Sequence, residues 1–529
     1  MDLERLRARG WPCPTGEEMG RVDAHAIERC GIPCGILMEA AGRAVVEAVR
    51  RAFPETRRPL VACGGGNNGG DGFVVARLLG QWGPECRPLV ISFAAPERQR
   101  PEARENLERL MSSGVEVIVK PGAEEISSLA KGSDLLIDAL FGVGLSRPVE
   151  GALGDALSAL DRSGLPTVAI DLPSGISSDT GVPLGAALGA DLTVSLGLPK
   201  LGLALRPDAA EILVADIGLP EASVEQAGIR QFLLTAPAAA ELLPPRPVEG
   251  HKGTFGHVLV AGGSEGKTGA AVLAAEGALR TGAGLVTVAA PRSLNAIFEV
   301  KLTEAMSLPV GSQLPFLDEA AVPAVVEEAG SRDALVFGPG IGRSSGTEVA
   351  TRAILEAVTA PTVIDADALN AFAGTPEGLA GPGPRVLTPH PGEAARLLAR
   401  SNADVQADRV GAARELARRS AAVVLLKGAR SVSASPAGEV WINPTGGPGL
   451  ASGGTGDVLA GVVGALLAQR LGPLDAARLG AFLHGLAGDL GPAVGGLASE
   501  LAARVPQAWR ELASAEVEPG ESGPLSRFP

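Results

Sequence analysis

The segment from Asn443 to Asp457 reads NPTGGPGLASGGTGD and runs directly into an apolar stretch, 458–469, with the pattern of a helix. Closely spaced glycines before a helix leave backbone N–H groups free to point at an anion, and the helix dipole favours negative charge there. A bound phosphate would repel the Asp457 carboxylate unless this group has a separate task, such as taking a proton from a substrate hydroxyl beside the phosphate. The segment therefore predicts phosphoryl transfer or elimination.

A second glycine-rich segment, CGGGNNGGDG from Cys63 to Gly72, follows an apolar run and precedes a helix-like stretch, 74–80. A turn in this context can approach a phosphate closely, although the spacing is not that of the GxGxxG motif. The side-chain amides of Asn67 and Asn68 add donors, and Asp71 can accept hydrogen bonds from the turn or from a ligand hydroxyl. A tight turn capped by these polar residues is the alternative.

Two further acidic residues, Asp138 and Asp171, come at the ends of expected strands, which is where open α/β sheets bind ligands. Each could serve only as a helix cap or a turn anchor. Together with the Asn-Gly segment, however, they converge on one edge of a sheet, and this convergence favours a ligand site.

The second half carries its own candidate residues at strand ends. Lys427, one of only seven lysines, lies beside a glycine and could neutralise nucleotide phosphates, or it could be a solvated loop residue. His390 lies between two prolines and could equally be structural. Glu393 could be a first-turn helix residue or a group that orients water around Mg²⁺.

The elements that must position these residues alternate in the manner of βαβ units. Short apolar runs such as 59–63, 135–138 and 167–171 are separated by helix-length amphipathic stretches, and the pattern restarts with runs such as 257–261. This alternation predicts two α/β domains with parallel sheets. The length of 529 residues agrees, because one hydrophobic core seldom grows beyond about 300 residues.

Composition alone would place the domain boundary near 242–248, but 231–235 reads as the opening strand of the second domain. We therefore predict a first domain over 1–228 and a second over 229–515. The residues 516–529 are rich in Pro, Gly, Ser and Glu, and we expect them to form a flexible tail.

The overall charge and cysteine content bound the class of protein. A net charge of −14 argues against a nucleic-acid surface, and no apolar run reaches membrane-spanning length without a glycine or charge. The five cysteines all lie in the first hundred residues without zinc-type spacing, and no signal peptide pattern is present. We expect reduced thiols in a cytoplasmic protein. We also expect a homo-oligomer, since large α/β enzymes often bury apolar helix faces against a copy of themselves.

From 18 to 218 the sequence resembles the N-terminal epimerase half of the bifunctional NAD(P)H-hydrate repair enzymes. The likeness is carried by ILMEAAG at 36–42, the motif at 67–72, DALFGVGLSRP at 138–148 and DLPSG at 171–175. It implies a Rossmann-like three-layer domain. The hydrate-binding residues implied by the resemblance are Asn67, Asn68, Gly69, Gly70, Asp71, Gly142, Val143, Gly144, Leu145, Ser146, Arg147, Pro148 and Asp171. The implied potassium ligands are Asn68, Asp138 and Ser174, all oxygen donors, which a hard cation prefers.

From 231 to 509 the sequence resembles the C-terminal half of the same family, the ADP- or ATP-dependent NAD(P)H-hydrate dehydratases of ribokinase-like fold. The likeness is carried by HKG, GPGIG, DADALN, TPHPGE, LKG, GGTGD and HGLAGD in this order, most specifically by 443–461. The implied contacts to the hydrate are Ala270, Gly340, His390 and Asp457. The implied nucleotide site comprises Lys427, Gly428, Ala429, Arg430, Ser431 and Gly456. Two departures stand out: 267–269 replaces an expected aromatic-plus-small-residue turn, and Ser431 stands where many relatives have threonine.

The resemblance implies two reactions at C6 of the hydrated nicotinamide ring. Epimerisation requires the carbinolamine to lose and regain its hydroxyl group or to open and close its ring, and Asp171 is the candidate acid and base for the proton transfers. In dehydration, Asp457 would deprotonate the hydroxyl as it attacks the terminal phosphoryl group of ADP or ATP, with Mg²⁺ and the GGTGD amides neutralising charge. The Mg²⁺ ligands and the choice between ADP and ATP are left open.

Two other readings remain open at the level of sequence. The second half could be a ribokinase-like kinase for a small alcohol, joined to a dinucleotide-binding module. The first half could be a dinucleotide sensor or a protein-interaction module without catalysis. A stable phosphorylated product would favour the kinase, whereas regenerated NADH would favour hydrate repair.

Overall fold

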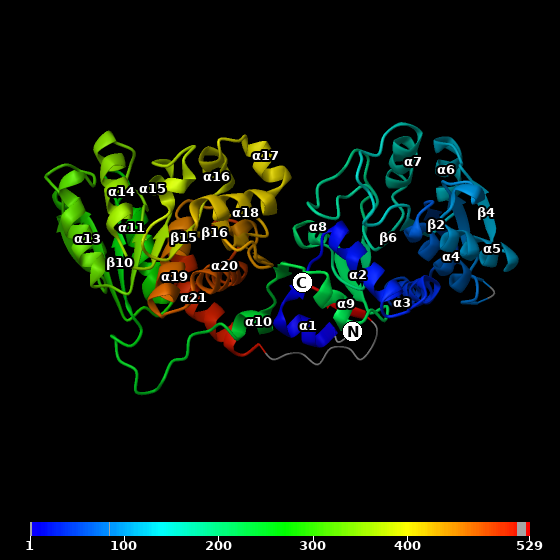
Figure 1. Cartoon of the computed structure of the whole chain (residues 1–529), viewed down its shortest axis with the longest axis horizontal. Coiled ribbons are helices and arrows are strands. Elements are labelled where there is room, and N and C mark those ends of the chain that lie inside the picture. Colours follow the sequence, from blue (N-terminus) through cyan, green and yellow to red (C-terminus); the bar gives the residue numbers. More distant parts are fainter. Residues whose placement is uncertain (1–2, 84, 516–524) are drawn as a thin grey trace. The chain divides into compact units, whose positions relative to one another are not determined.

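The structure is a computed structural model that describes residues 3–83, 85–515 and 525–529. The chain divides into two compact units, which we describe separately (Figure 1). Unit 1 comprises Met1–Gln231 and Val517–Pro529, and unit 2 comprises Phe232–Glu516. The units divide between Gln231 and Phe232, whereas the sequence led us to expect a boundary at residue 228.

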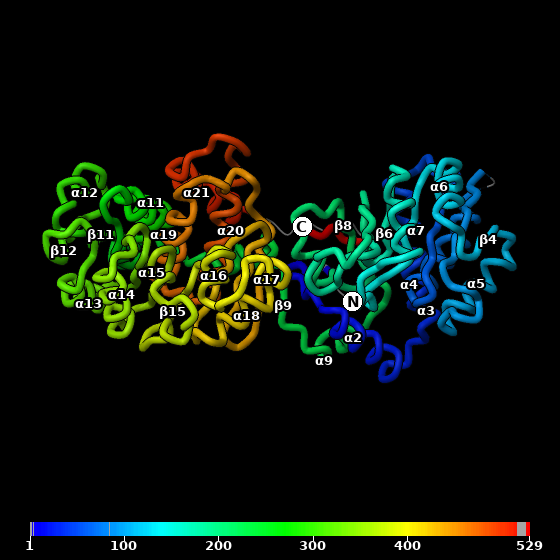
Figure 2. Tube along the Cα trace, turned by 90° about the horizontal axis from the view of Figure 1, so that it is seen from above, coloured from blue at the N-terminus to red at the C-terminus, as the bar shows by residue number. Residues whose placement is uncertain are grey.

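Unit 1 is built on a sheet with the strand order β19-β8-β7-β6-β5-β2-β3-β4. All neighbouring strands are parallel except β19, which runs antiparallel to β8. Figure 2 shows β4 at one edge of this sheet. The strands of the unit are β1 Trp11–Pro12, β2 Pro59–Cys63, β3 Leu89–Ser92, β4 Glu116–Val119, β5 Leu135–Ala139, β6 Thr167–Ile170, β7 Leu192–Leu196, β8 Glu211–Ala215 and β19 Leu525–Phe528.

Helices cover both faces of this sheet, so unit 1 has three layers. One buried cluster joins the sheet to α2, α3, α4, α5 and α9, and another joins the opposite face to α6 and α7. The helices are α1 Leu3–Arg9, α2 Gly16–Glu28, α3 Cys34–Ala52, α4 Asn67–Leu79, η1 Pro96–Arg98, α5 Pro101–Ser112, α6 Ala123–Lys131, α7 Gly151–Asp161, α8 Leu201–Ala204 and α9 Glu221–Gln226.

The direction in which the chain adds strands to the unit 1 sheet reverses between β2 and β5. From β2 the chain proceeds to β3 and β4 on one side, whereas β5, β6, β7 and β8 lie on the other. The loops after β2 and β5 therefore diverge at the carboxyl edge of the sheet, and such a switch point is where open α/β sheets bind ligands.

Helix α4 begins earlier than expected, because Asn67 to Gly72 form its first turns rather than a loop before it. The turn is confined to residues 64–66. The glycines of α4 are explained by close packing: a Cβ on Gly69 would lie 2.0 Å from the carbonyl oxygen of Gly64, and one on Gly72 would lie 2.5 Å from the Ala139 side chain.

Unit 2 contains a larger sheet with the order β9-β18-β17-β16-β15-β14-β13-β10-β11-β12. The strands from β16 to β12 along this order are parallel, and β16, β17 and β18 form an antiparallel meander. The strands are β9 Gln231–Leu233, β10 His257–Ala261, β11 Leu285–Pro291, β12 Met306–Val310, β13 Ala334–Phe337, β14 Thr362–Ile364, β15 Arg385–Leu387, β16 Val423–Leu426, β17 Val432–Ala434 and β18 Val440–Ile442.

One face of the unit 2 sheet packs against α11, α19, α20 and α21 in a single buried cluster. Helices α13 and α18 pack against β10 and β16 and do not belong to this cluster. The helices are α10 Ala236–Ala240, α11 Thr268–Arg280, η2 Arg292–Leu294, α12 Asn295–Lys301, η3 Glu319–Ala321, α13 Val322–Gly330, α14 Ser345–Ala357, α15 Asp367–Asn370, η4 Pro376–Leu379, α16 Pro391–Leu398, α17 Asn402–Ala407, α18 Arg409–Ser420, η5 Pro448–Leu450, α19 Thr455–Ala468, α20 Pro473–Asp489 and α21 Ala498–Ala513.

The predicted α/β class is confirmed in both units, with one correction at the C-terminus. Of the expected flexible tail, 516–524 lie outside the described residues, but Leu525–Phe528 form β19 and complete the unit 1 sheet. The apolar side chains of Leu525 and Phe528 are buried, which explains why this short segment adopts a strand. Within the part of the chain that the structure describes, no helix combines the length and apolar character needed to cross a bilayer.

Candidate active sites

The carboxyl edge of the unit 1 sheet encloses a cavity of about 580 Å³. Its walls come from α2 and α3, from the loops after β2 and β5, and from the ends of β6 and β7. The predicted hydrate-binding residues that line it are Asn67, Asn68, Asp71, Gly142, Val143, Gly144, Leu145 and Asp171. The segments that sequence reasoning singled out therefore meet at one cavity.

Five residues predicted to bind the hydrate do not line the cavity. Gly69 and Gly70 lie in the first turns of α4 and pack against backbone of the turn before it and of α5. Ser146, Arg147 and Pro148 continue the loop after β5 and are exposed.

Asp171, the candidate acid and base, forms a buried ion pair with Lys200 in the wall of this cavity. The Lys200 ammonium also donates to the carbonyl oxygen of Leu196 at 2.8 Å, and the Leu196 N–H donates to the Asp171 carboxylate at 3.2 Å. Asp171 has a φ of 71°, in the left-handed region that non-glycine residues rarely adopt. Strain of this kind persists only where the surroundings fix the residue, which is common at functional sites.

Two further carboxyl groups line the same cavity. Burial raises the pKa of Asp71 well above its usual value, and the charge of Asp171 adds to this effect. Burial also raises the pKa of Asp23 to about 6, against the opposing influence of Lys200. The cavity thus brings together carboxyl groups whose surroundings differ, around one lysine.

Of the predicted potassium ligands, Asn68 lines the cavity, whereas Asp138 and Ser174 are fully buried and do not line it. The Ser174 hydroxyl donates to Asp138 at 2.6 Å, and burial raises the pKa of Asp138 to about 6 although the bonds from Ser174 oppose this shift. Both amide atoms of Asn68 are buried without a hydrogen-bond partner. A buried amide oxygen without a partner can accept a cation, and the carboxylate of Asp138 and the hydroxyl of Ser174 are oxygen ligands as well, so these residue types fit a potassium ion chemically.

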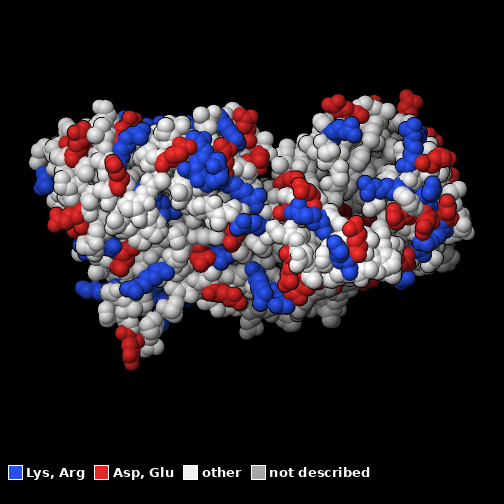
Figure 3. Space-filling model, viewed as in Figure 1, with Lys and Arg blue, Asp and Glu red and all other residues white. Residues whose placement is uncertain are grey.

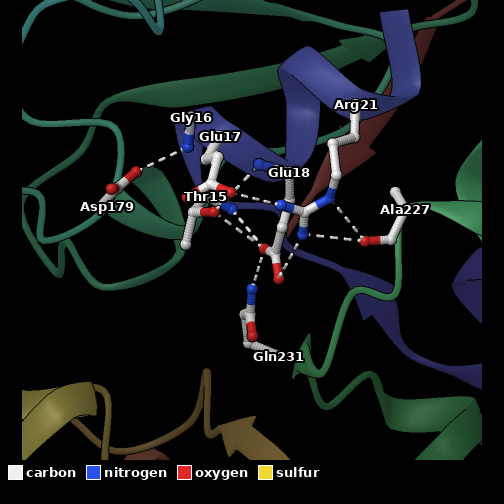
Figure 4. Close-up of polar contacts among 8 residues, drawn as sticks. All are labelled: Thr15, Gly16, Glu17, Glu18, Arg21, Asp179, Ala227 and Gln231. Carbon is white, nitrogen blue, oxygen red and sulfur yellow. Dashed lines mark hydrogen bonds and ion pairs between the residues drawn. The ribbon is translucent and has the colours of Figure 1, made fainter. Parts of the chain in front are cut away.

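Helix α2 forms one wall of the cavity, and its start is anchored by several contacts (Figure 4). Thr15 caps the helix in a reciprocal pair with Glu18, and the N–H of Gly16 donates to Asp179 at 2.7 Å. Arg21 donates to the carbonyl oxygen of Ala227 at 3.0 Å. These contacts fix the rotation of α2 about its axis and thereby the side chains that it presents to the cavity.

Unit 2 has a more open cavity of about 420 Å³ at the N-terminus of α19. It is lined by three of the predicted hydrate contacts, Ala270, Gly340 and Asp457, together with Gly453 and Gly454 of the glycine-rich segment. Gly454 has a φ of 94° and directly precedes α19, and the first N–H groups of a helix have no partner within it. The glycine-rich segment therefore presents backbone donors beside the Asp457 carboxylate.

Asp457 lies near a buried ion pair between Lys427 and Asp365, whose charged atoms are 2.8 Å apart. Although burial favours the neutral amine, Asp365 and Glu393 keep the pKa of Lys427 above its usual value. Burial, with a further contribution from Asp365, raises the pKa of Asp457 to about 7. Asp457 therefore titrates near neutrality, as a general base should.

The two acidic residues of the DAD sequence, Asp365 and Asp367, contact different cations at this cavity. Between them, Ala366 has a φ of 52°, a strained value for a residue with a side chain. Asp365 turns inward to Lys427, whereas Asp367 binds Lys267 at 2.9 Å and Arg343 at 3.2 Å. Lys267 begins the segment 267–269, which replaces the expected aromatic-plus-small-residue turn, and it adds a cation to the cavity wall.

The remaining predicted residues of unit 2 lie around the cavity rather than in its lining. His390 caps α16 by accepting the Gly392 N–H at 3.0 Å, and burial and Lys427 lower the pKa of its imidazole. Its backbone N–H donates to Glu393 at 2.8 Å, and Glu393 does line the cavity. The loop after β16 carries Lys427, Gly428, Ala429, Arg430 and Ser431, and a Cβ on Gly456 would lie 3.4 Å from the Lys427 ammonium.

Sequence reasoning missed Asp23, Lys200 and Asp365 as parts of these sites. Lys200 carried a usable signal, because it is one of seven lysines and follows β7 at the ligand-binding edge of the sheet. Asp365 likewise ends β14, within the DADALN motif. Asp23 carried no such signal, since it lies within the amphipathic helix α2, where an acidic residue is normally solvated.

Comparison with known proteins covers both units. Residues 34–202 match the family described as YjeF-related protein N-terminus, and residues 258–507 match the family described as NAD(P)H-hydrate dehydratase. The bifunctional NAD(P)H-hydrate repair enzyme of Moorella thermoacetica is 43% identical over 490 residues, which cover 90% of this chain and 91% of that enzyme.

Further similar proteins include a second bifunctional enzyme and a dehydratase that corresponds to unit 2. The Escherichia coli bifunctional NAD(P)H-hydrate repair enzyme is 35% identical over 83% of this chain and 81% of its own length. A crystal structure of the Bacillus subtilis ADP/ATP-dependent NAD(P)H-hydrate dehydratase, co-crystallised with ATP and Mg²⁺, aligns at 30% identity over 53% of this chain and 98% of that one, with a TM-score of 0.46. On the strength of the identity along nine-tenths of its length, the chain belongs to the family of bifunctional NAD(P)H-hydrate repair enzymes.

Proposed function

We propose that unit 1 interconverts the R and S epimers of hydrated NADH or NADPH and that the ribokinase-like unit 2 dehydrates the S epimer at the expense of ADP or ATP. The observation that carries this proposal is the pairing, in one chain of this family, of two cavities that each place an acidic side chain beside a glycine-rich turn. In unit 1 this residue is Asp171, and in unit 2 it is Asp457.

In unit 1, Asp171 is the proposed acid and base at the C6 hydroxyl of the hydrate. Its ion pair with Lys200 stabilises the carboxylate, and the bond from the Leu196 N–H fixes its orientation. The loop after β5, with Gly142 to Leu145 in the cavity wall, is the proposed support for the dinucleotide. The exposed continuation of this loop, residues 146–148, remains a proposed contact to more distant parts of the substrate.

The potassium ion that the family implies would be held by Asn68, Asp138 and Ser174. When bound, it would supply a fixed positive charge beside the cavity. The Asn68 amide, which has no partner among the described residues, supports this assignment. Gly142 lies against Asn68, since a Cβ there would be 3.5 Å from the Asn68 side chain. Asn68 therefore couples the ion site to the substrate loop.

In unit 2, Asp457 is the proposed base that takes the proton from the C6 hydroxyl as the oxygen attacks the terminal phosphoryl group. The backbone N–H groups at the start of α19 stabilise the charge that develops on the phosphoryl oxygens. Loss of phosphate then restores the dihydropyridine, because phosphate is a far better leaving group than hydroxide. Ala270 and Gly340 shape the wall against which the nicotinamide ring lies, and His390 is a proposed neighbouring contact.

The nucleotide is the proposed ligand of the loop 427–431 and of Gly456, with the Lys427 ammonium at its inner end. Mg²⁺, when bound, would neutralise the phosphate oxygens. Mg²⁺ usually keeps several waters and binds through one or two carboxylates plus substrate phosphates. Glu393, whose pKa is raised by burial, lines the cavity and is the proposed group that orients water around this ion.

The decisive experiment supplies the purified chain with mixed NADH hydrate epimers and Mg²⁺, with and without ADP. Recovery of absorbance near 340 nm from both epimers requires both activities. Recovery of the S fraction alone would remove the epimerase, and a stable phosphorylated product without NADH would identify a small-alcohol kinase instead. ATP in place of ADP, and NADPH hydrate in place of NADH hydrate, then establish the preferred substrates.

We further propose that the protein works in the cytoplasm as a homo-oligomer without nucleic-acid or membrane partners. All five cysteines are free thiols, which suits a reducing compartment. On the face seen in Figure 3, acidic and basic side chains are interspersed rather than gathered by sign. Val300 of α12 and Met306 of the edge strand β12 expose apolar surface that a second copy could cover. Sedimentation equilibrium of the wild type and of Val300→Glu tests the oligomer.

A further inference from the structure

We propose that Asp23 of α2 is a second catalytic group of the unit 1 cavity, the proton donor that works opposite Asp171 when the hydrated ring opens. This inference rests on the proposed epimerase function of unit 1. It adds a residue from an element that none of the sequence motifs includes.

The geometry of α2 supports this assignment. Met19, Gly20, Asp23 and Ile27 all line the cavity, and their spacing of three to four residues places them on one face of the helix. Met19 and Ile27 are apolar, so Asp23 is the carboxyl group that α2 presents on this face. Asp171 and Lys200 lie at the ends of β6 and β7 in the same cavity, so a bound ring can have carboxyl groups from two different walls.

The position of Asp23 is fixed by the anchoring of α2 rather than by partners of its own. The capping pair of Thr15 and Glu18 and the bond from Gly16 to Asp179 hold the first turn of the helix (Figure 4). A Cβ on Gly16 would lie 2.8 Å from the carbonyl oxygen of Val143, so the start of α2 packs tightly on the proposed substrate loop. The helix that carries Asp23 therefore has a fixed position relative to the loop that would hold the dinucleotide.

The chemistry requires two groups in different protonation states. In ring opening, one group removes the proton of the C6 hydroxyl, the C6–N1 bond breaks with its electron pair passing to N1, and a second group donates a proton to N1. Rotation about C5–C6 turns the resulting aldehyde. Reversal of the same transfers then closes the ring on the other face, and both groups regain their starting protonation state. No oxidant, reductant or other co-reactant is consumed.

Ring opening is the route that fits a repair enzyme with a separate nucleotide-dependent step. Loss of the hydroxyl group as water would instead give an iminium ion, which forms the dihydropyridine directly by losing a proton from C5. That outcome would make the phosphate donor of unit 2 unnecessary. Unit 1 should therefore keep the C6–O bond and break the C6–N1 bond.

The surroundings of Asp23 and Asp171 separate the two roles. The ion pair with Lys200 stabilises the carboxylate of Asp171 as the base. Asp23 has no ion pair among the described residues, and burial raises its pKa to about 6. A larger fraction of Asp23 is therefore protonated near neutral pH than of an aspartic acid with the ordinary pKa of 3.8. Pairs of carboxyl groups whose surroundings separate them in this way divide acid and base roles in other enzymes.

The charged and titratable groups facing Asp23 come from every wall of the cavity. Lys200 lowers its pKa and Asp171 raises it. Asp71 of α4 and Cys34 of α3 also interact with Asp23 electrostatically. Since Asp23 must be protonated to act as the donor, kcat/KM for exchange should decline above pH about 6, where Asp23 loses its proton.

The test compares Asp23→Asn with the wild type in the full chain, measuring R-to-S exchange by NMR and nucleotide-dependent dehydration of the S epimer as an internal control. Loss of a general acid typically costs about 10²- to 10⁴-fold in rate. We expect an exchange rate reduced by at least about 10²-fold, loss of the decline above pH about 6, and unchanged dehydration. Asp23→Glu, which retains the carboxyl group, should recover part of the exchange.

Glu17→Gln is the matched control, because Glu17 lies on the same helix, has a side chain that is 85% exposed and forms an ion pair with Arg21. It removes the same charge and should exchange at the wild-type rate. Wild-type exchange with an unaltered pH profile in Asp23→Asn would overturn the assignment, as would loss of NADPH binding to unit 1 in both Asp23 variants. No exchange by the wild-type chain would instead overturn the epimerase function itself.

Discussion

The ammonium of Lys427 lies 2.8 Å from the carboxylate of Asp365, and both side chains are shielded from solvent. Asp457 lies near this pair, and burial, with a further contribution from the charge of Asp365, raises its pKa to about 7 although Lys427 opposes the shift. A buried carboxyl group in a cavity whose pKa is shifted in this way is a candidate for a functional site.

The first prediction concerns the base of unit 2. Asp457→Asn removes the proton acceptor and should lower nucleotide-dependent recovery of NADH by about 10²- to 10⁴-fold. In the wild type, kcat/KM for the S hydrate should rise with pH and level off above about 7, because only the carboxylate accepts the proton. Single-turnover absorbance measurements between pH 5.5 and 9 check both points. Near-native turnover in Asp457→Asn would refute the base role.

The same raised pKa has a consequence for folding. The unfolded chain releases the Asp457 proton near its ordinary value of 3.8, whereas the folded chain holds it to about 7. The cost of ionising Asp457 in the fold therefore grows from pH 4 to pH 7 and is fully present above that. Asp457→Asn should raise Tm at pH 8, and this gain should vanish near pH 4. Calorimetry at both pH values checks it; an equal gain at both would point to another cause.

A second prediction separates the two activities within one chain. Asp171→Asn should abolish R-to-S exchange, with a loss of about 10²-fold or more, while dehydration of the S epimer continues. Lys200→Met should also lose exchange, because Asp171 would be buried without its counter-charge. Arg77→Met, which removes another half-buried cation of unit 1 outside the cavity, serves as the control. Unchanged exchange by NMR in Asp171→Asn would remove the assignment.

A third prediction concerns the ion beside the unit 1 cavity. Exchange should be faster in potassium chloride than in choline chloride at equal ionic strength, and potassium should raise Tm, since an ion that binds the folded chain stabilises it. Asn68→Leu, which cannot ligate a cation, should lose both effects. Asn106→Leu is the control, because Asn106 is also a buried amide of unit 1 but lies outside the cavity. A potassium-dependent Tm shift that persists in Asn68→Leu would place the ion elsewhere.

The sequence predicted those parts of the fold and the sites that depend on local pattern. The strands Pro59–Cys63 and His257–Ala261 have the predicted bounds, because parallel strands buried on both faces read as continuous apolar runs. The short antiparallel strands β17 and β18 were not predicted, since they lack such runs. Leu525–Phe528 was misjudged because its pairing with β8 is a contact that only the folded chain reveals.

The difference between local pattern and contacts made only in the folded chain also explains which site residues could be predicted from the sequence. Asp138, Asp171 and Lys427 were predicted because each lies at or just after the end of a strand, at the edge where ligands bind. The start of α4 at Asn67 was missed because a run of glycines normally disfavours a helix, whereas here close packing against the sheet requires them. Asp23 was missed because its place in the cavity wall depends on how α2 packs against the rest of unit 1, which no local pattern records.

The last prediction concerns the packing that holds Asp457 in place. Helices α11 and α19 approach so closely that a Cβ on Gly461 would lie 1.9 Å from the carbonyl oxygen of Ala274. This atom is backbone and cannot turn aside, so Gly461→Ala must separate the helices. Overpacking of this kind costs about 1–3 kcal/mol. Urea unfolding followed by circular dichroism should show this loss of stability for unit 2. The rate of dehydration should also fall, because the N-terminus of α19 moves with the helix.

Gly330→Ala at the exposed end of α13, where a Cβ meets nothing within 4 Å, is the control and should leave stability unchanged or slightly increased. A Gly461→Ala protein as stable as Gly330→Ala would mean that the α11 and α19 backbones do not approach as described.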